Sequence, residues 1–460
     1  MTSLRSRADA ILSGSGAEPR GCARAVPCLG ARLLVVALLC LLWAGVSSAS
    51  PPVMQQPQPF GHFDFPTCVR YALMHSDELL RARLDIQIKS VDLKDAHSEL
   101  LPVLTLYTRY YVSRAGQPNI TNPVNVQLLM ENWNPYVALL KIKSHGTIVD
   151  IAKIAHVDKI SGEVARLAKL FYGIHILDKS IRANKQMLAL YRSKVSYGKS
   201  RDEQGTADPL ELRAWECAYR SQMIRVKSLQ KEMEWYISDV KSLIGFHPDY
   251  HLPLDTRDAA NQVLGGFNGH LVTFADIEAA NLGLKIAAKK EQVQSNKIMA
   301  AYVALLPRPQ IVFEDVQNQV DRTSGFNLAL GLDYTLWDGF RRVRDIKRQK
   351  MEFRKLNLSR HLQAKDLYGK FKDLRMEVGL SWEREVDARE KAKLAELREE
   401  KAFLEYGAGR LPHDVYLDRR IDTVQAQVDA IYACRSRVNA LIDLATIAGG
   451  LNKYNAAIRY

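Results

Sequence analysis

The placement of proline is the feature that most constrains how this chain can fold. Four long stretches lack it, residues 136–208, 210–247, 254–306 and 310–411. Because proline breaks the interior of a helix, only such stretches can hold long uninterrupted helices. Within the last stretch, residues 341–406 are dense in helix-forming types, and only Gly369 and Gly379 disfavour a helix. A single helix there would be about 100 Å long, so the sequence predicts a stalk or tube.

The apolar residues of this stretch recur with the three-and-four spacing of a helix face. They are Ile346, Phe353, Leu356, Leu367, Phe371, Leu374 and Val378. Such spacing is typical of a coiled packing seam. The composition agrees, because 47% hydrophobic and 25% charged residues describe a folded protein rather than a disordered one. We therefore expect long helices that pack against one another.

The beginning of the chain has the pattern of a targeting segment. An apolar run from Leu33 to Trp43 follows several arginines and precedes the small residues Ser47-Ser48-Ala49, which suit cleavage. The run is short for a membrane span, which takes about 20 residues. We predict a signal peptide at 1–49 and a proline-rich linker at 50–64, with an uncleaved anchor as the alternative.

Cleavage would change both the charge and the cysteine content. The leader holds five Arg, one Asp and one Glu, so its removal lowers the net charge from +13 to +10. It would leave Cys68, Cys217 and Cys434, an odd number that cannot form a complete disulfide framework. We expect these three cysteines to be small buried residues of helices.

A shorter stretch shows the alternation of a β-strand. In residues 326–337 the apolar side chains of every second position alternate with small or polar ones. One face is therefore apolar, as in a strand that faces lipid on one side and water on the other. A half-buried strand of a soluble protein would read the same way. Aromatic residues near the expected strand ends suit a membrane interface but also ordinary strands: Tyr107, Tyr110, Tyr111, Trp133, Tyr136, Tyr334 and Trp337.

The chain also repeats itself. Leu100-Leu101-Pro102 recurs as Leu305-Leu306-Pro307, and the turn at Gly205 recurs at Gly409. Such repeats indicate duplication and a pseudosymmetric architecture. We predict two halves, at 65–245 and 271–450, each in the order helix, two strands, long helix, helix. A loop-like connection at 246–270 joins them, and a tail follows at 451–460.

The long helices of the two halves are expected to differ in length. The first is predicted to run from Gly146 to Gly205 and the second from Gly339 to Gly409. The difference is about three turns, which would keep the same helix face inward.

In this order the residues resemble the TolC-like outer-membrane efflux and secretion channels, from about Phe65 to Gly450. The strongest motif is Tyr334-Thr335-Leu336-Trp337-Asp338-Gly339, which is similar to the family's junction from the last strand to the long helix. Tyr406-Gly407-Ala408-Gly409 resembles the turn at the periplasmic tip. The first half departs from the pattern, because Ser144-His145-Gly146 stands where the second has Trp-Asp-Gly.

The resemblance implies an α+β membrane protein, a homotrimer in which each chain gives four strands to one twelve-stranded β-barrel that continues into a long α-helical barrel. The protein would lie in the lipid of the bacterial outer membrane, with its helical part in the periplasm. It would be the passive exit duct of a tripartite efflux or type I secretion system. Its partners would be a periplasmic adaptor and an inner-membrane pump or ABC transporter.

The resemblance also gives roles to particular residues. Gly205 and Gly409 would form the tip turns that dock the adaptor, and simple helix C-caps are the alternative. Trp337, Asp338 and Gly339 would form the strand-to-helix junction. Asp414 and Asp418 are the candidate periplasmic gate, although Asp414 lies one residue nearer to Gly409 than the family pattern has it. A solvated helix face is the alternative for both.

An elementary argument supports this architecture independently. Four strands cannot close a barrel by themselves, and lipid tolerates no unpaired backbone edge. Association of several chains would remove the edges. Long helices without a globular core likewise need neighbours to cover their apolar stripes.

Other classes of function find little support. No HExxH, P-loop or strand-following G-x-G-x-x-G is present, and the eleven histidines are scattered, so we expect no enzyme activity, metal or cofactor. The positive charges are interspersed along helix faces, so we expect no nucleic-acid partner. The main alternative is an exported coiled-coil structural or adaptor-like periplasmic protein, which would leave the alternating strand and the repeat unexplained.

Overall fold

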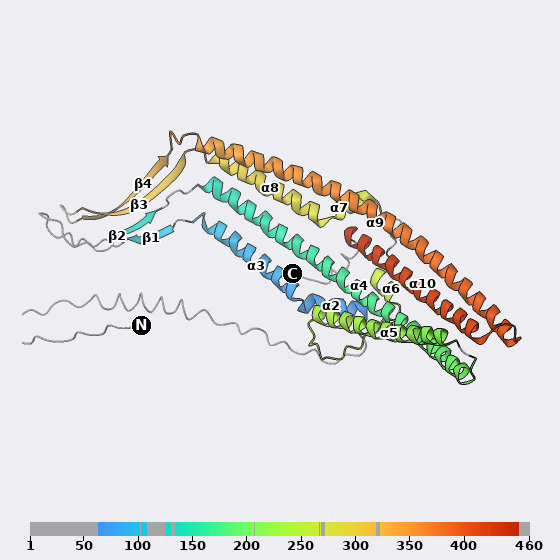
Figure 1. Cartoon of the computed structure of the whole chain (residues 1–460). Coiled ribbons are helices and arrows are strands. Elements are labelled where there is room, and N and C mark those ends of the chain that lie inside the picture. Colours follow the sequence, from blue (N-terminus) through green and yellow to red (C-terminus); the bar gives the residue numbers. More distant parts are fainter. Residues whose placement is uncertain are drawn as a thin grey trace, which may run out of the picture. The chain divides into compact units, whose positions relative to one another are not determined.

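The structure is a computed structural model that describes residues 63–101, 103–107, 125–129, 134–206, 208–265, 267, 272–318 and 323–449 (Figure 1). These residues belong to one unit, Pro59–Tyr460. The predicted signal peptide 1–49, all but the last two residues of the linker 50–64 and the tail 451–460 lie outside them. So do the side chains of residues 326–330, whose alternation predicted a strand.

The two halves of the chain have the same order of elements. The first contains α2 (Phe65–His75), α3 (Asp77–Ser98), β1 (Val103–Tyr107), β2 (Asn125–Leu129), α4 (Pro135–Glu203) and α5 (Pro209–Ile244). The second contains α7 (Phe274–Ala280), α8 (Leu282–Val303), β3 (Arg308–Asn318), β4 (Thr323–Asp333), α9 (Arg341–Gly407) and α10 (His413–Ile447). The short helix α6 (Ala259–Leu264) lies between them.

A helix break recurs at equivalent places. Ser76 separates α2 from α3 with φ −65° and ψ 120°, and Asn281 separates α7 from α8 with φ −64° and ψ 119°. Asn281 accepts a hydrogen bond from the Leu284 N–H at 2.9 Å, which caps α8. The two breaks have the same sequence separation as the two Leu-Leu-Pro motifs.

The strands and the helices are arranged in the same lateral order. The described strands form an antiparallel sheet in the order β1-β2-β3-β4. At the end of the sheet the helices continue it and pack side by side in the order α3-α4-α8-α9. Farther from the sheet, the order of neighbouring helices is α5-α4-α10-α9 (Figure 1). Each of α3, α4, α8 and α9 leads directly into or out of one strand. Each strand therefore continues one helix of the layer.

The long helix predicted from the second half is confirmed. α9 is a single helix of 67 residues, and all the seam residues predicted from their spacing are buried or half-buried. They pack against neighbouring helices, with Leu367, Phe371 and Val378 in one cluster with Ile277 and Leu444. The three-and-four spacing therefore identified the packed face correctly.

The predicted start of the first long helix is wrong. α4 begins at Pro135, not at Gly146, and its 69 residues slightly exceed the length of α9. The side-chain oxygen of Asn134 accepts hydrogen bonds from the N–H groups of Tyr136 and Val137 at 3.1 and 3.2 Å. Because proline suits the first helical position and asparagine the cap before it, this dipeptide starts the helix. Ser144-His145-Gly146 is helix interior.

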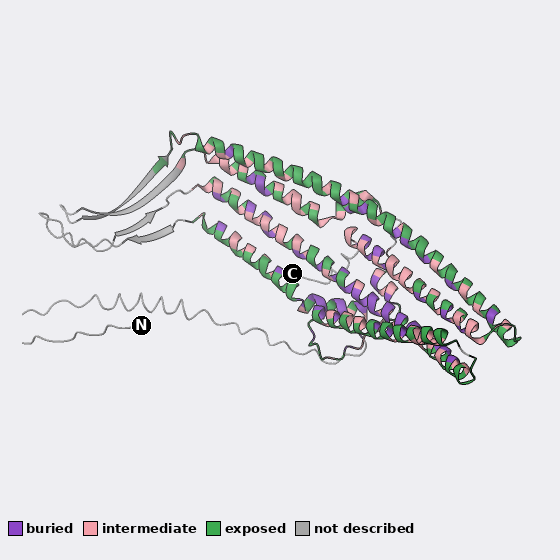
Figure 2. Cartoon of the chain, viewed as in Figure 1, coloured by how far each residue is buried: buried purple, intermediate pink, exposed green. Residues whose placement is uncertain are grey.

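The main core is built around α4. In this helix 26 residues are buried, against 8 in α9, which lies at the edge of the layer (Figure 2). The middle of α4 packs against α2, the end of α5, α6 and the end of α10. Phe65, Phe171 and Tyr172 are among its largest fully buried side chains. A helix with neighbours on both sides buries more of its surface.

Two further expectations are corrected. The connection 246–270 is not merely loop-like, because it contains α6 and contributes Phe246, Leu252 and Val263 to the core. The strand predicted to reach Trp337 ends at Asp333. Within the described part, none of the helices combines the length and the hydrophobicity that crossing a membrane requires.

The three described cysteines do not share one environment. Burial, with a smaller contribution from Asp64, raises the pKa of the Cys68 thiol to about 12. Cys434 is half-buried and its Sγ lies 3.2 Å from the hydroxyl of Tyr172. Cys217 is exposed, so the expectation of a buried residue is wrong there.

Candidate functional site

The two predicted tip turns have the same backbone construction. Gly205 has a φ of +68° and Gly409 a φ of +70°. In the first turn the Gly205 N–H donates to Asp202 O and the Thr206 N–H to Arg201 O, both at 2.9 Å. In the second turn Gly409 and Arg410 donate to Tyr406 and Glu405, again at 2.9 Å. Both are Schellman motifs, in which a left-handed glycine ends the helix and satisfies its last carbonyls.

The helices that follow the turns start close to a proline. Pro209 is the first residue of α5, and the Asp208 carboxylate caps this helix by accepting from the Leu210 N–H at 2.9 Å. Pro412 directly precedes α10. Each turn is therefore a short hairpin between two helices, fixed on one side by glycine and on the other by proline.

The two hairpins are packed against each other through aromatic rings. The ring of His413 on α10 lies 5.0 Å from that of Tyr197 on α4 and 5.2 Å from that of Tyr406 on α9. Tyr406 stacks on Tyr416 at 5.1 Å with an interplanar angle of 5°. The two turns therefore belong to one surface at the end of the unit far from the sheet (Figure 1).

Apolar side chains lie exposed near both turns. Leu210 is 76% exposed after the first turn, and Phe403 and Leu404 are 57% and 67% exposed before the second. Neither Gly205 nor Gly409 would bring an added Cβ within 4 Å of another described atom. The turns are therefore open to a partner, and glycine is required there by the backbone conformation alone.

The structure places the two candidate gate aspartates differently. Asp418 on α10 forms an ion pair with the ammonium group of Lys194 on α4, which also donates a hydrogen bond to the carboxylate. The Lys194 side chain is only 8% exposed and its ammonium lies 4.8 Å from the centre of the Trp215 ring. Asp414 lies in the first turn of α10, where the helix dipole favours a carboxylate. It forms no ion pair within the described part of the chain.

The carboxylates of this region nevertheless affect a neighbouring tyrosine. Burial, together with the carboxylates of Asp418 and Asp422, raises the pKa of Tyr191 on α4. Lys194 therefore compensates Asp418 without removing the local negative potential. Asp418 thus has its partner, Lys194, within the same chain.

The strand-to-helix junction is a second constructed site. Asp338 accepts from the Arg342 N–H at 3.1 Å through its side chain and from the Arg341 N–H at 3.3 Å through its backbone. Gly339 and Phe340 both have a φ of +61°. Trp337 is 73% exposed, and its ring meets that of Phe340 edge-on at 4.9 Å. The Asp-Gly pair thus lies in the turn that leads the chain from β4 into α9.

Sequence reasoning missed a buried ionic cluster between α9 and α10. The Glu385 carboxylate is 2% exposed and binds Arg437 at 2.8 Å, and it also pairs with Arg389 one turn along α9. The Arg437 guanidinium lies 4.5 Å from the centre of the Trp382 ring. In the sequence Glu385 is one of many glutamates of a charged helix, so no local signal distinguishes it.

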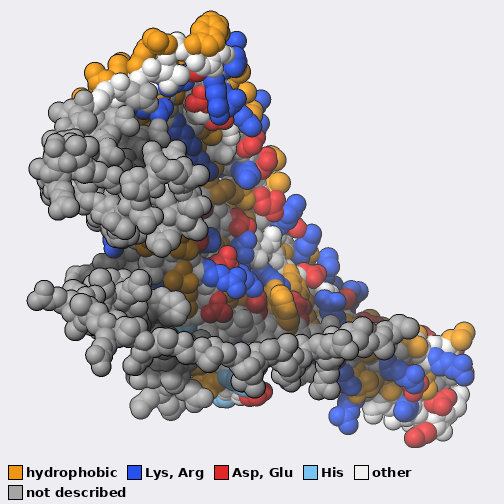
Figure 3. Space-filling model, turned by 90° about the vertical axis from the view of Figure 1, so that its left-hand side faces the viewer, with side chains coloured by type: hydrophobic (Ala, Val, Ile, Leu, Met, Phe, Trp, Pro, Cys, Tyr) orange, Lys and Arg blue, Asp and Glu red, His pale blue; other side chains and the backbone are white. Residues whose placement is uncertain are grey.

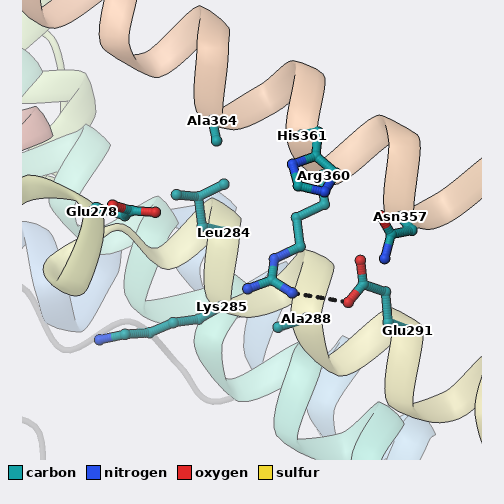
Figure 4. Close-up of a pocket in the computed structure, with 9 residues that line it drawn as sticks. All are labelled: Glu278, Leu284, Lys285, Ala288, Glu291, Asn357, Arg360, His361 and Ala364. Atoms are coloured by element: carbon teal, nitrogen blue, oxygen red, sulfur yellow. Dashed lines mark hydrogen bonds and ion pairs between the residues drawn. The ribbon is translucent and has the colours of Figure 1, made fainter.

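Figure 4 shows a cavity of about 310 Å³ between α8 and α9. Arg360 reaches across it and pairs with Glu291 at 3.0 Å. Lys285, Glu278 and His361 also line it. Two carboxylates thus face two permanent cations, and the cavity has no excess charge to attract an ion.

Solved outer-membrane channels have the same fold. The channel OprN aligns with a TM-score of 0.69 and 12% identity, over 84% of this chain and 90% of that one. CusC, a protein described for transmembrane channel formation, gives 0.71 and 11% over 87% and 98%. The outer membrane channel CmeC of Campylobacter jejuni gives 0.67 and 14% over 85% and 88%. No family model and no curated protein matches the sequence. The resemblance to TolC-like channels is confirmed at the level of the fold.

Proposed function

We propose that this chain, which has the TolC-like fold, is one third of an outer-membrane exit duct. The observation that carries the proposal is the one-to-one continuation of four strands by four helices in the same lateral order. Such an arrangement is a segment of a wall. A wall segment has a function only when copies of it close into a tube.

The two edges of the segment support closure with further copies. At one edge, α3 carries exposed apolar residues spaced along one face, namely Leu80, Leu84, Ile88 and Val91. At the other edge, α9 exposes a longer series that includes Val343, Met351, Leu358 and Leu362. Unequal edges suit a head-to-tail interface, which forms a closed ring when the rotation between copies closes. We propose a homotrimer.

The sheet also requires further copies of the chain. β1 and β4 are the edges of the described sheet, and free edges are not tolerated in lipid. Three copies would give one twelve-stranded barrel in the outer membrane, and the helices would continue it into the periplasm. We further propose that the matching element order of the two halves reflects an internal duplication.

The hairpins around Gly205 and Gly409 are the proposed docking surface for a periplasmic adaptor, which would connect the duct to an inner-membrane pump or ABC transporter. A trimer would present six such turns around its mouth. Asp414 and Asp418 are the proposed gate at this mouth, where three copies of each carboxylate would favour cations. Because Lys194 holds Asp418, opening would require this pair to rearrange or to move as a unit.

Transport through this duct is proposed to be passive, with the energy supplied by the inner-membrane partner. The solved channels with this fold are channel proteins by their descriptions, and efflux of small molecules or secretion of proteins both fit a duct. Co-purification from the native membrane would identify the adaptor and pump and so decide between them.

The decisive experiment fractionates cells that express the full chain and determines the size of the detergent-extracted protein. A trimer in the outer-membrane fraction is expected. A soluble protein, or a monomer in detergent, would overturn the proposal and favour a periplasmic coiled-coil protein. Leu330→Asp in β4 should lower trimer assembly, because a charged side chain on the lipid-facing side is unfavourable, although an aspartate costs less than the about 2–4 kcal/mol of an arginine or lysine at the membrane midplane.

Two variants separate the roles assigned to the tip. Gly409→Val should abolish adaptor binding while the trimer remains folded, because it distorts the turn and not the seam. Asp418→Ala should retain adaptor binding and change single-channel conductance or cation block in planar bilayers. Unchanged conductance and selectivity in Asp418→Ala would remove the gate assignment and leave the duct intact.

A further inference from the structure

A second cavity, of about 730 Å³, lies where α8 ends, β3 begins and α9 begins. It is lined by five arginines, Arg308, Arg341, Arg342, Arg344 and Arg348. Among the described residues, two carboxylates line the same cavity, those of Asp338 and Asp345. In contrast to the cavity of Figure 4, where the charges balance, this one has a clear excess of positive charge.

The ion pairs within the cavity leave two arginines uncompensated. Arg342 is held by Asp338 at 3.6 Å and donates to Thr335 Oγ1 at 2.9 Å. Arg348 pairs with Asp345 at 3.5 Å. Arg341 and Arg344 are exposed and form no ion pair within the described part of the chain. Their guanidinium groups are therefore available to an external anion.

The start of α9 adds to this positive potential. Its first turn contains no acidic residue and begins with Arg341 and Arg342. Basic residues at a helix N-terminus are unfavourable, because they lie beside the positive end of the helix dipole. A phosphate group would relieve this repulsion, since guanidinium binds phosphate oxygens in a bidentate manner.

Exposed apolar and aromatic side chains adjoin the arginines. Leu336 is 90% exposed, Leu332 76% and Trp337 73%, and Phe340 directly precedes the arginine pair. Figure 3 views the unit from the side of the sheet and shows hydrophobic side chains at the top beside Lys and Arg side chains. Aromatic residues next to basic ones are typical of a membrane–water interface. A free phosphate ion would leave these apolar residues in water, whereas a phospholipid would cover them.

From these observations we infer that the junction between the sheet and α9 binds an anionic phospholipid. Arg341 and Arg344 contact the headgroup phosphate, and Leu336 and Trp337 lie against the upper part of the acyl chains. The inference rests on the proposed function, because it requires the sheet to lie in the membrane. It adds a lipid-binding site that would fix the height of the duct in the bilayer.

The test uses the purified full-length trimer in detergent micelles that contain phosphatidylglycerol and phosphatidylcholine in equal amounts, with bound lipid counted by native mass spectrometry. The wild type should retain phosphatidylglycerol in preference, and less of it as salt is raised. Arg341→Gln with Arg344→Gln should weaken the apparent affinity about 25-fold, because each basic residue near an anionic surface contributes a factor of about five.

The matched control is Arg375→Gln with Arg398→Gln, two exposed arginines of the same helix that form no described ion pair. This control changes the net charge equally and should retain the wild-type preference. Arg344→Gln alone provides a milder variant if the double variant does not assemble. Leu336→Ser with Trp337→Ser should weaken phosphatidylglycerol binding but not the binding of inorganic phosphate.

Three outcomes would overturn the inference. Equal retention of both lipids by the wild type, or equal loss in the control and junction variants, would show that no specific headgroup site exists. Full competition by inorganic phosphate, with no effect of the Leu336 and Trp337 substitutions, would show an ion site rather than a lipid site. In each case an assembled outer-membrane trimer would leave the proposed duct unaffected.

Discussion

Lys194 on α4 and Asp418 on α10 form an ion pair whose two partners differ greatly in exposure. The Lys194 side chain is 8% exposed and the Asp418 side chain 51%. The lysine therefore depends on this carboxylate and on the Trp215 ring for compensation of its charge. The pair joins the two hairpins just inside the tip, next to the cluster of Met187, Leu190, Leu417 and Ile421.

Removing the carboxylate should destabilise this end of the unit. Asp418→Asn leaves a largely buried ammonium without its counterion, and we expect a loss of about 1–2 kcal/mol, limited by the solvent that reaches Asp418. Asp422→Asn is the matched control, because Asp422 forms only an exposed pair with Arg419 at 3.6 Å, and it should cost less than about 0.5 kcal/mol. Chemical denaturation followed by circular dichroism measures both. Equal losses in the two variants would show that the Lys194–Asp418 pair contributes no more to stability than an exposed ion pair.

The buried Glu385 should matter more than its sequence neighbours. Glu385→Gln removes the shared partner of Arg389 and Arg437, and we expect a loss of about 1–3 kcal/mol in stability. The cost stays below that of a fully buried pair, because both guanidinium groups remain partly exposed. Glu390→Gln, an exposed position on the same helix with no described ion pair, should be nearly neutral. No measurable loss of stability in Glu385→Gln would show that this ionic cluster contributes nothing net to the packing of α9 against α10.

Two glycines that lie close together in α9 and its turn should respond in opposite directions. Gly409→Ala forces a side chain into the left-handed region at a φ of +70° and should lower stability by about 1 kcal/mol. Gly407→Ala lies in the last helical position with open space around it and should raise stability by about 0.5–1 kcal/mol. Gly409→Asn should lower the stability less than Gly409→Ala does, because asparagine tolerates the left-handed conformation. Thermal unfolding of the three variants tests the order.

Acid should destabilise the helical part through a buried histidine. Burial lowers the pKa of His156 on α4 below its ordinary value of 6.5, and Arg83 and Lys159 lower it further. Since the folded state holds the neutral ring, its contribution is complete above pH 6.5 and is lost as the pH falls through the lowered folded pKa. We expect His156→Gln to flatten the fall in stability on the acid side of pH 6.5. An unchanged slope would assign the acid sensitivity to other groups, such as His175, whose pKa burial also lowers.

Some parts of the architecture were predictable because they depend on local rules. Proline placement and the spacing of Leu367, Phe371 and Val378 are properties of one helix, so they predicted α9 and its packed face. The tip glycines were predictable for the same reason, because a left-handed residue ends a helix wherever it occurs. The Asn134-Pro135 start of α4 also follows a local rule, the asparagine cap before a proline at the first helical position.

Other parts depended on contacts between distant segments. The exposure of Cys217 and the burial of Phe246 follow from which helices cover them, and the sequence around each gives no measure of that. Lys194 and Asp418 belong to different halves of the chain, as do Tyr197 and His413. Only the packing of α4 against α10 brings them together.

The sequence by itself determined the course of α9, the order of the long helices and strands, the form of the turns and the apolar seam, because each follows from backbone sterics and periodicity within one segment. The tertiary structure alone decided which charges are buried, as at Lys194 and Glu385, and which arginines have no ion-pair partner among the described residues, as at Arg341 and Arg344. The physical reason is that burial and electrostatic compensation depend on neighbours in space, and these neighbours come from segments far apart in the chain.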